Sequence, residues 1–307
     1  MHFINAKSIL TPRSMNIYRG CTHGCIYCDS RSRCYQFTHA FEDVEVKQNA
    51  PELLEATLRK KRKRCMIGTG SMGDPYLPAE KDLCLMRRCL EVIDRHSFGV
   101  SPLTKSDLIL RDLDLLSRIN RKAKAVVQMT LTTVDDELCR KIEPGVCPTS
   151  RRFEVLMACR EAGIPTVVWF SPLLPFINDT VENVDGIVDY CVRAKVHAII
   201  CFGIGLTLRE GNREYFYAAL ASINNQQFFH ISDTEQHLLR YFYTYRSFLC
   251  VTSNVLLPYI KLAHYFSSQQ ALYYICLLSR HLHTHPLLCM LCLLQYTEQV
   301  KCDNPLS

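Results

Sequence analysis

The chain of 307 residues is 48% hydrophobic and carries a formal net charge of +6, from 36 basic and 30 acidic side chains. This length can bury one large core, or one domain with an appendage, and it excludes a small secreted disulfide scaffold in spite of 17 cysteines. Most of these cysteines are expected to be reduced thiols that pack as small hydrophobic side chains. The N-terminal segment lacks the basic, apolar and small-residue parts of a secretory signal, so we expect a cytoplasmic protein without membrane contact.

Between residue 15 and about residue 217, short apolar or β-branched runs alternate with longer segments of helical period. This alternation predicts βα units and a parallel sheet. Strands are expected at 15–18, 65–68, 99–104, 125–131, 166–170 and 197–202, with helices at 51–60, 82–96, 108–120, 150–161 and 181–194. Capping side chains at Asn178, Asp179 and Thr180, and the pair Gly163 and Pro165, mark two helix ends. The pattern predicts an α/β fold, a partial and open (β/α)6 barrel, with its chemistry on loops at the C-terminal strand ends.

Six consecutive basic residues occupy positions 59–64. A solvated helix end is the simpler interpretation of such a run, and contact with a phosphate backbone is the alternative. The run has no interleaved aromatic residues of the kind that single-strand binders use for stacking.

The last part of the chain, residues 221–307, differs from the rest. It holds nine charged residues in 87 positions and no glycine. Its apolar runs show no clean period and fall short of the roughly 18 uninterrupted residues of a membrane span. We therefore divide the chain into a core domain, 1–220, and an atypical tail, 221–307. The hypothesis for the tail is that it is disordered or arose from a reading-frame shift near residues 221–226.

Three cysteines, Cys21, Cys25 and Cys28, stand within eight positions of the loop after the first expected strand, beside Gly20 and Gly24. Three thiolates on one loop can hold three corners of an iron-sulfur cluster and leave the fourth iron open. A structural zinc site would need a fourth ligand, for which His23 and Cys34 are candidates with atypical spacing. A chance grouping of buried cysteines is the third interpretation.

The cysteine spacing Cys-x3-Cys-x2-Cys, with Tyr27 before the last cysteine, resembles the cluster loop of the radical S-adenosylmethionine (SAM) superfamily. The segments RGCTHGCIYCDSR, TGSMGDPYLPAE, TKSDLILRDLDLL, MTLTT and FGIGLTLREGNREYFY resemble its spore photoproduct lyase-like branch, whose members are often labelled DNA repair photolyase-related. The resemblance runs from about Asn5 to Leu220 and does not extend into the tail. It implies a partial barrel of the radical SAM type.

The resemblance also implies a cofactor pair and a reaction. A 4Fe-4S cluster on Cys21, Cys25 and Cys28 would cleave S-adenosylmethionine reductively, and the 5'-deoxyadenosyl radical would abstract hydrogen from a substrate. The cofactors supply this chemistry, and the protein supplies position and exclusion of water. The implied partners are an electron donor such as flavodoxin or ferredoxin and an unknown substrate, with DNA or another nucleic acid as the candidate of a lyase-like enzyme.

Further site residues follow by position within the resemblance. Tyr27 would pack near the adenine, or else is a core aromatic. Ser71 or Asp74 would accept from the methionine ammonium, or else this segment is a turn and Glu80 caps the next helix. Lys105 and Ser106 would face the methionine carboxylate, unless the lysine is only solvated.

Polar residues after the later strands complete the expected site. Thr132 and Thr133 are candidates for the ribose hydroxyls. If the barrel interpretation holds, the polar residues after the last two strands should face the substrate: Ser171, Asn178, Asp179, Arg209, Glu210 and Asn212.

One departure from the family concerns hydrogen return. The spore enzyme carries a cysteine on its second strand, whereas this chain has Thr69-Gly70-Ser71 there and Cys65 at the other strand end. Repair of a thymine dimer by that route is therefore not expected. Two alternatives to a radical enzyme remain: a zinc-stabilised nucleic-acid-binding module, and a catalytically impaired relic whose tail leaves the site open to water.

Overall fold

The computed structural model describes residues 1–174, 177–202 and 205–224. In this part of the chain, six parallel strands form one sheet of order β2-β5-β6-β7-β8-β9. The strands are β2 (Ser14–Met15), β5 (Met66–Thr69), β6 (Gly99–Thr104), β7 (Val127–Thr130), β8 (Thr166–Trp169) and β9 (Ala198–Ile200). The α/β fold with an open parallel sheet, consistent with the predicted partial barrel, is confirmed. The expectations for the tail lie, from residue 225 onward, outside the described residues.

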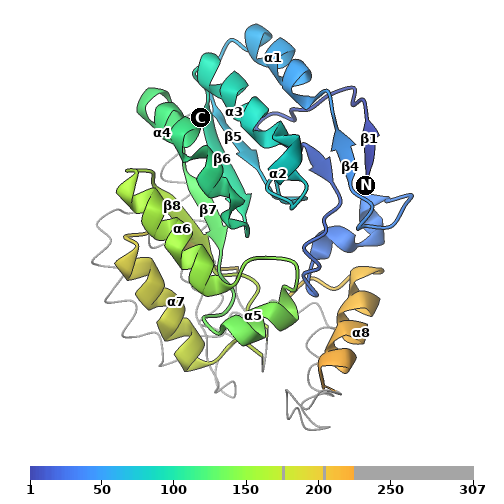
Figure 1. The fold of residues 1–307 in the computed structure, drawn as a ribbon. Helices are drawn as coiled ribbons and strands as arrows, with labels where there is room; N and C mark the ends of the chain where they lie inside the picture. The colour runs from blue at the N-terminus through green and yellow to red at the C-terminus, as the bar shows by residue number, and fades with distance from the viewer. Residues whose placement is uncertain (175–176, 203–204, 225–307) are drawn as a thin grey trace, which may run out of the picture.

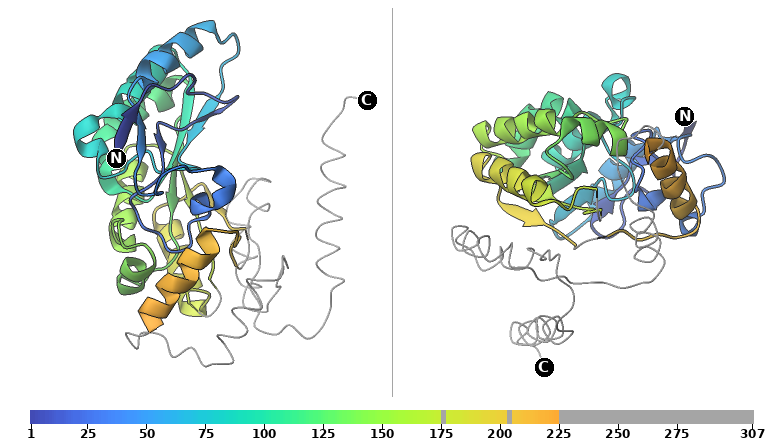
Figure 2. Two further views of the ribbon diagram at one scale, coloured as in Figure 1. Left: turned by 90° about the vertical axis from the view of Figure 1, so that its right-hand side faces the viewer. Right: turned by 90° about the horizontal axis from the view of Figure 1, so that it is seen from below.

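Helices connect the strands and pack along one side of the sheet (Figures 1 and 2). They are α1 (Ala50–Lys60), α3 (Leu85–Arg95), α4 (Leu113–Lys122), α6 (Thr149–Glu161) and α7 (Val181–Arg193). The core forms between these layers, because apolar residues at helical spacing, such as Leu54 and Leu58 of α1, pack with strand residues such as Ile67 and Val100. The other helical elements of this part are α2 (Glu80–Leu83), α5 (Asp136–Ile142), α8 (Asn212–Asn224), η1 (Asp29–Arg31), η2 (Arg33–Tyr35) and η3 (Asp107–Asp112).

The first expected strand, 15–18, proved to be two strands in different sheets. Met15 ends β2, whereas Tyr18 begins β3 (Tyr18–Arg19) of a second sheet of order β1-β4-β3. Its other strands, β1 (His2–Ile4) and β4 (Glu45–Lys47), were not predicted, because three residues are too few to show a period. The last described helix, α8, continues past the expected boundary at residue 220 and ends at Asn224.

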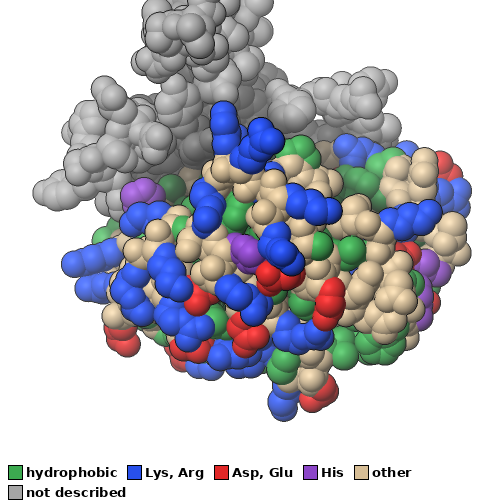
Figure 3. Space-filling view, turned by 90° about the horizontal axis from the view of Figure 1, so that it is seen from above, with side chains coloured by type: hydrophobic (Ala, Val, Ile, Leu, Met, Phe, Trp, Pro, Cys, Tyr) green, Lys and Arg blue, Asp and Glu red, His purple; other side chains and the backbone are tan. Residues whose placement is uncertain are grey.

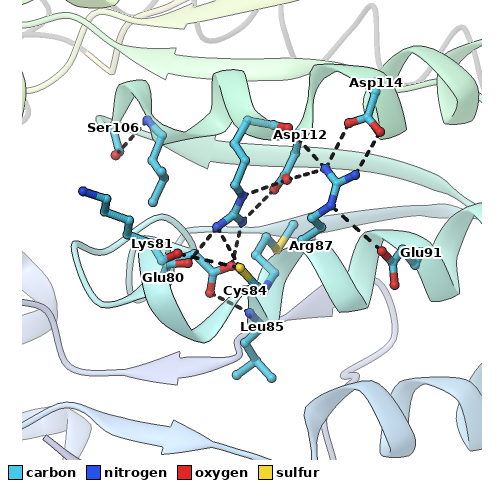
Figure 4. Close-up of polar contacts among 12 residues, drawn as sticks. Glu80, Lys81, Cys84, Leu85, Arg87, Glu91, Ser106, Asp112 and Asp114 are labelled. Carbon is cyan, nitrogen blue, oxygen red and sulfur yellow. Dashed lines mark hydrogen bonds and ion pairs between the residues drawn. The ribbon is translucent and has the colours of Figure 1, made fainter.

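The expected helix 82–96 is divided at Cys84, which has a left-handed φ of 49°. The buried carboxylate of Glu80 accepts the backbone N–H groups of Leu85 at 3.0 Å and Met86 at 2.9 Å. Glu80 therefore caps the next helix, as the turn interpretation of this segment predicts. Arg111 binds the same carboxylate at 2.8 Å and thereby fastens η3 to α2. Figure 4 shows Glu80 beside Leu85 at the start of the next helix.

Two other predicted helix ends are confirmed. The Thr180 hydroxyl accepts the Asn183 N–H at 3.2 Å at the start of α7, and Gly163 follows α6 with φ +68°. No helix of the described part is long and apolar enough to span a membrane.

The basic run 59–64 ends α1 and precedes β5, so it lies at the N-terminal edge of the sheet. The face of the molecule seen from that end shows Lys and Arg side chains with acidic side chains among them (Figure 3). The mixture of charges favours the interpretation as a solvated helix end over a continuous phosphate-binding stripe.

Candidate functional site

The cysteine loop, residues 20–28, follows β3 and begins with Gly20, a position that requires glycine. Gly20 has φ +96°, and a Cβ added there would lie 2.5 Å from the carbonyl oxygen of Phe41. That oxygen instead accepts the N–H of Cys21 at 3.1 Å. All three thiols are free; Cys25 is buried, and Cys21 and Cys28 are half-buried.

The loop rests on the segment that follows α5. The Ile26 N–H donates to the Ile142 carbonyl at 3.0 Å, and the Gly145 N–H donates to the His23 carbonyl at 2.8 Å. The His23 ring returns a contact, with Nδ1 3.1 Å from the Gly145 oxygen. A Cβ at Gly145 would lie 2.6 Å from the His23 oxygen, so this close approach needs a glycine.

Asp74, just after β5, connects the loop to the ends of two strands. Its carboxylate accepts the Tyr76 N–H at 2.8 Å, the Thr104 hydroxyl at 2.7 Å and the Lys105 N–H at 2.8 Å. His23 Nε2 lies 3.1 Å from the remaining side of the carboxylate, although the ring is not aligned for a hydrogen bond. Burial works to raise the pKa of Asp74, but His23 and these hydrogen bonds lower it to about 2. Asp74 is therefore an ionised, fully engaged carboxylate.

Lys105 follows β6 and is half-buried beside the loop. Its ammonium lies 5.7 Å from the centroid of the Tyr27 ring. Burial works to lower the pKa of Lys105, but the neighbouring Cys25 and Glu143 outweigh it, and the pKa is raised. The lysine therefore keeps its positive charge next to the thiols.

A buried ion pair, Glu143 and Arg152, contacts the hydroxyl end of Tyr27. The Tyr27 hydroxyl donates to Glu143, and Arg152 Nη2 donates to the same carboxylate at 2.5 Å. Arg152 also donates to the carbonyl oxygens of Thr130 at 3.0 Å and Cys147 at 2.9 Å. Both charged side chains of the pair are completely buried. A buried charge of this kind requires a partner of opposite charge. Here the pair also holds Tyr27 of the cysteine loop in position.

Sequence reasoning missed this pair. The available signal was Arg152 itself, which occupies the same helical face as the buried residues Val155, Leu156 and Cys159 of α6. A charge on the apolar stripe of a helix indicates a buried partner. Nothing in the sequence near Glu143 identified it as that partner.

The cysteine loop suits a metal group better than it suits free thiolates. Burial raises the pKa of Cys21 to about 12 and also raises that of Cys25, so a thiolate here needs a cationic partner such as iron. His23 has one ring nitrogen toward Gly145 and the other toward Asp74, so it would have to give up one of these contacts to become a fourth zinc ligand. Three cysteines without a fourth ligand match the donor set of a cluster with one open iron.

The other expected site residues divide into two groups. Tyr27, Asp74 and Lys105 do converge on the cysteine loop, whereas Ser71 is exposed on the loop after β5. The contacts of Tyr27 favour its interpretation as a core aromatic over a position against adenine, because its ring is buried and its hydroxyl is engaged.

The hydroxyl candidates are engaged within the protein. The Ser106 hydroxyl accepts the Leu108 N–H at 3.3 Å and caps η3. The Thr132 hydroxyl donates to Glu143 at 3.2 Å, and that of Thr133 accepts the Asp135 N–H at 3.2 Å.

Most of the polar residues expected to face the substrate make intramolecular contacts. Asn178 is buried and donates to the Thr132 carbonyl at 2.8 Å. Arg209 pairs with Asp29 at 2.6 Å, while Glu210 pairs with Arg33. These two pairs join the segment after Cys28 to the turn before α8. The two segments lie close together in Figure 1. They hold these two segments together beside α8.

The model of the Radical SAM superfamily matches residues 15–191, which is more than half of the chain. The chain belongs to the radical SAM superfamily. A protein of Mycobacterium tuberculosis is 31% identical over 228 residues, which cover 71% of this chain and 65% of that protein. A protein of Methanocaldococcus jannaschii is 33% identical over 192 residues, which cover 60% of this chain and 71% of that protein. The chain thus spans slightly less than two thirds of the length of the mycobacterial relative.

Two solved structures share the fold. A spore photoproduct lyase variant with bound AdoMet and dinucleoside spore photoproduct has a TM-score of 0.53 at 12% identity, covering 67% of this chain and 60% of that chain. A second variant of that lyase also has a TM-score of 0.53, at 13% identity, covering 72% and 64%. At this identity the likeness concerns the fold of the radical SAM core.

Proposed function

We propose that this chain is a radical SAM enzyme in which residues 1–224 form the catalytic core. The observation that carries the proposal is one loop with three free cysteines that lies beside the charged Lys105 and the anchored Asp74, which follow β6 and β5. Such strand ends are where enzymes of open α/β and barrel folds place their chemistry. The family of the chain supports the same reaction class.

Cys21, Cys25 and Cys28 would hold a 4Fe-4S cluster, and S-adenosylmethionine would bind beside it. When bound, this cofactor pair supplies an electron and, through reductive cleavage, a 5'-deoxyadenosyl radical for hydrogen abstraction from the substrate. The chain itself orients the loop through His23 and Asp74 and offers the Lys105 ammonium to a carboxylate. Ser71, Ser106 and Thr132 remain proposed contacts of S-adenosylmethionine, and for Ser106 and Thr132 this requires their present hydrogen bonds to be exchanged.

The proposed substrate class is a nucleic acid, and the proposed reaction is that of a lyase. A nucleic-acid substrate and a lyase reaction rest on the fold shared with a lyase solved with a dinucleoside spore photoproduct. The basic run 59–64 adds nothing to this proposal, because it lies at the edge of the sheet opposite to the cysteine loop. Flavodoxin or ferredoxin is the proposed class of electron donor.

The test is formation of 5'-deoxyadenosine by the full-length, anaerobically reconstituted and dithionite-reduced protein. Cys25→Ala should abolish both iron uptake and product. Cys34→Ala is the matched control, since Cys34 is exposed and outside the set of three cysteines, and it should retain both. A colourless protein with one bound zinc would contradict the proposal and favour the zinc module. Iron uptake without product would favour the relic.

A further inference from the structure

A second group of metal-ligating side chains lies at the start of the chain, outside the cysteine loop. His2, His39 and Glu45 each offer a ligand atom, and these atoms all lie within 4.8 Å of one another. The three residues come from β1, from the segment before β4, and from β4 itself. The side chains of His39 and Glu45 are 16% and 12% exposed, whereas that of His2 is 41% exposed, so two of the three candidate ligands are well shielded.

The smaller sheet places two of the three residues in register. His2 of β1 is the direct partner of Glu45 in the parallel pair with β4. On its other side, Glu45 is paired with Arg19 of the antiparallel strand β3. His39 reaches the same carboxylate from the preceding segment, with Nε2 2.9 Å from Glu45 Oε1.

Each histidine is oriented by a contact of its other ring nitrogen. His2 Nδ1 lies 3.0 Å from Asp43 Oδ2, and His39 Nδ1 lies 2.9 Å from the carbonyl oxygen of Ala40. Histidines that bind metals commonly donate the N–H of one nitrogen to a carboxylate or a backbone carbonyl, which fixes the tautomer and leaves the other nitrogen for the metal. In both histidines Nδ1 makes this contact, so Nε2 is the candidate ligand atom. In His39 this nitrogen faces Glu45 Oε1, and a cation would replace the contact between the two groups.

The remaining surroundings hold the ligands in place. The His2 and His39 rings meet edge to face at 4.9 Å, and Phe37 packs against His39 at 5.6 Å. Arg19 donates to Glu45 Oε1 at 3.0 Å and is itself anchored by the carbonyl oxygens of Tyr35 and Gln36. A carboxylate has two oxygens, so Arg19 can orient one while the other binds a cation.

We propose that His2, His39 and Glu45 bind a zinc ion, with water as the fourth ligand. Two imidazoles and one carboxylate are a ligand set that zinc accepts, whereas magnesium prefers oxygen ligands. The ion would link β1, the segment before β4, and β4 at one point. Arg19 precedes Gly20 and Cys21 directly, so this link would stabilise the surface from which the cysteine loop departs.

Zinc retention by the full-length chain, produced without a histidine tag and reconstituted with iron and sulfide, tests the proposal. After equilibrium dialysis against zinc, metal analysis should find one zinc more in the wild type than in His2→Ala or His39→Ala. His96→Ala is the matched control, because His96 also contacts a carboxylate, Glu55 at 2.6 Å, but is not part of this group. It should retain the wild-type zinc content. Dialysis against magnesium should give no comparable uptake.

Asp43→Asn provides a test that removes no ligand. It replaces the carboxylate behind His2 and should weaken zinc affinity by about 10- to 100-fold while the far-ultraviolet circular dichroism spectrum is unchanged. Equal zinc content in the wild type and both ligand variants would overturn the proposal, as would equal loss in His96→Ala. The test compares the zinc content of histidine variants that all share the same cysteine loop. Its outcome is therefore independent of whether that loop binds a cluster.

Discussion

Asp74 is a single carboxylate that links the cysteine loop to the ends of two strands. It accepts hydrogen bonds from Tyr76, Thr104 and Lys105, and it lies beside His23 of the cysteine loop. With these partners, its oxygens are already used for positioning. The amino group of S-adenosylmethionine could bind Asp74 only by displacing one of them, so we assign Asp74 as a positioning residue.

Asp74→Asn should therefore loosen the cysteine loop. The amide keeps the shape of the side chain but loses the negative charge, and hydrogen bonds to charged groups contribute about 1.5–3 kcal/mol each. We expect faster loss of iron from the reconstituted protein, followed as the decay of cluster absorbance. Asp82→Asn, at an exposed position of α2, is the control and should decay like the wild type. Equal decay in both variants would show that Asp74 does not position the loop.

Glu143→Gln tests the buried ion pair. Removing one charge of a buried pair leaves the other uncompensated, which costs about 3–5 kcal/mol of unfolding free energy. Burial works to raise the pKa of Glu143, but Arg152 and Lys105 outweigh it, and the pKa lies below its ordinary value of 4.5. The contribution of the carboxylate to stability is therefore present above that ordinary value and is lost as the pH falls through the lowered pKa.

Urea unfolding at several pH values checks this expectation. The stability difference between the wild type and Glu143→Gln should be largest near neutral pH and should shrink below about pH 4.5. Glu137→Gln, an exposed position paired with Lys141, should change stability by at most about 1 kcal/mol. A difference that stays constant into the acid range would contradict a lowered pKa for Glu143.

At the scale of helices and strands, the local sequence predicts only part of the candidate site. The parallel strands and the cysteine loop could be predicted, because their signals are local: apolar runs, capping residues and a fixed cysteine spacing. The smaller sheet could not, since its strands have only two or three residues. Nor could the pairing of Glu143 with Arg152, or the dependence of the loop on Gly145, because these contacts arise only when α5 and α6 dock against the loop.

Gly145→Ala tests the contact between elements. The added Cβ would meet backbone atoms of His23 at 2.6 to 2.8 Å, so the cysteine loop would have to move. We expect reduced iron uptake during reconstitution. Gly163→Ala is the control, because its Cβ would meet nothing within 4 Å although its φ of +68° makes alanine unfavourable there. It should lower stability by about 1–2 kcal/mol and leave iron uptake unchanged. Similar iron uptake in Gly145→Ala and the wild type would refute the close contact.

At the scale of the whole molecule, the basic run 59–64 and the cysteine loop lie at opposite edges of the sheet. The basic run 59–64 precedes β5, whereas the cysteine loop contacts residues that follow β5 and β6. Electrostatic effects between exposed charges are largely screened beyond a Debye length, which is about 8 Å at physiological ionic strength. The basic run should therefore have no direct part in the chemistry of the site.

Replacement of Lys60, Lys61, Arg62 and Lys63 by glutamine tests this separation. The variant should form 5'-deoxyadenosine at a rate within about twofold of the wild type, since these side chains are screened from the site. Lys105→Gln, beside the cysteine loop, should lower the rate strongly in the same assay. If the quadruple variant lost cleavage of S-adenosylmethionine, the two edges would have to be coupled.

The cysteine loop and the segment after it contact residues that lie far along the sequence, and these residues are synthesised much later. Gly145 follows His23 by 122 residues, and Arg209 follows Asp29 by 180. At about 5–20 residues per second, a ribosome needs at least about ten seconds to add those 180 residues. During that interval the three thiols emerge without the groups that later surround them. The contacts of this region are complete only after Arg209 has been translated, so maturation of the proposed metal site should follow elongation of the core rather than accompany it.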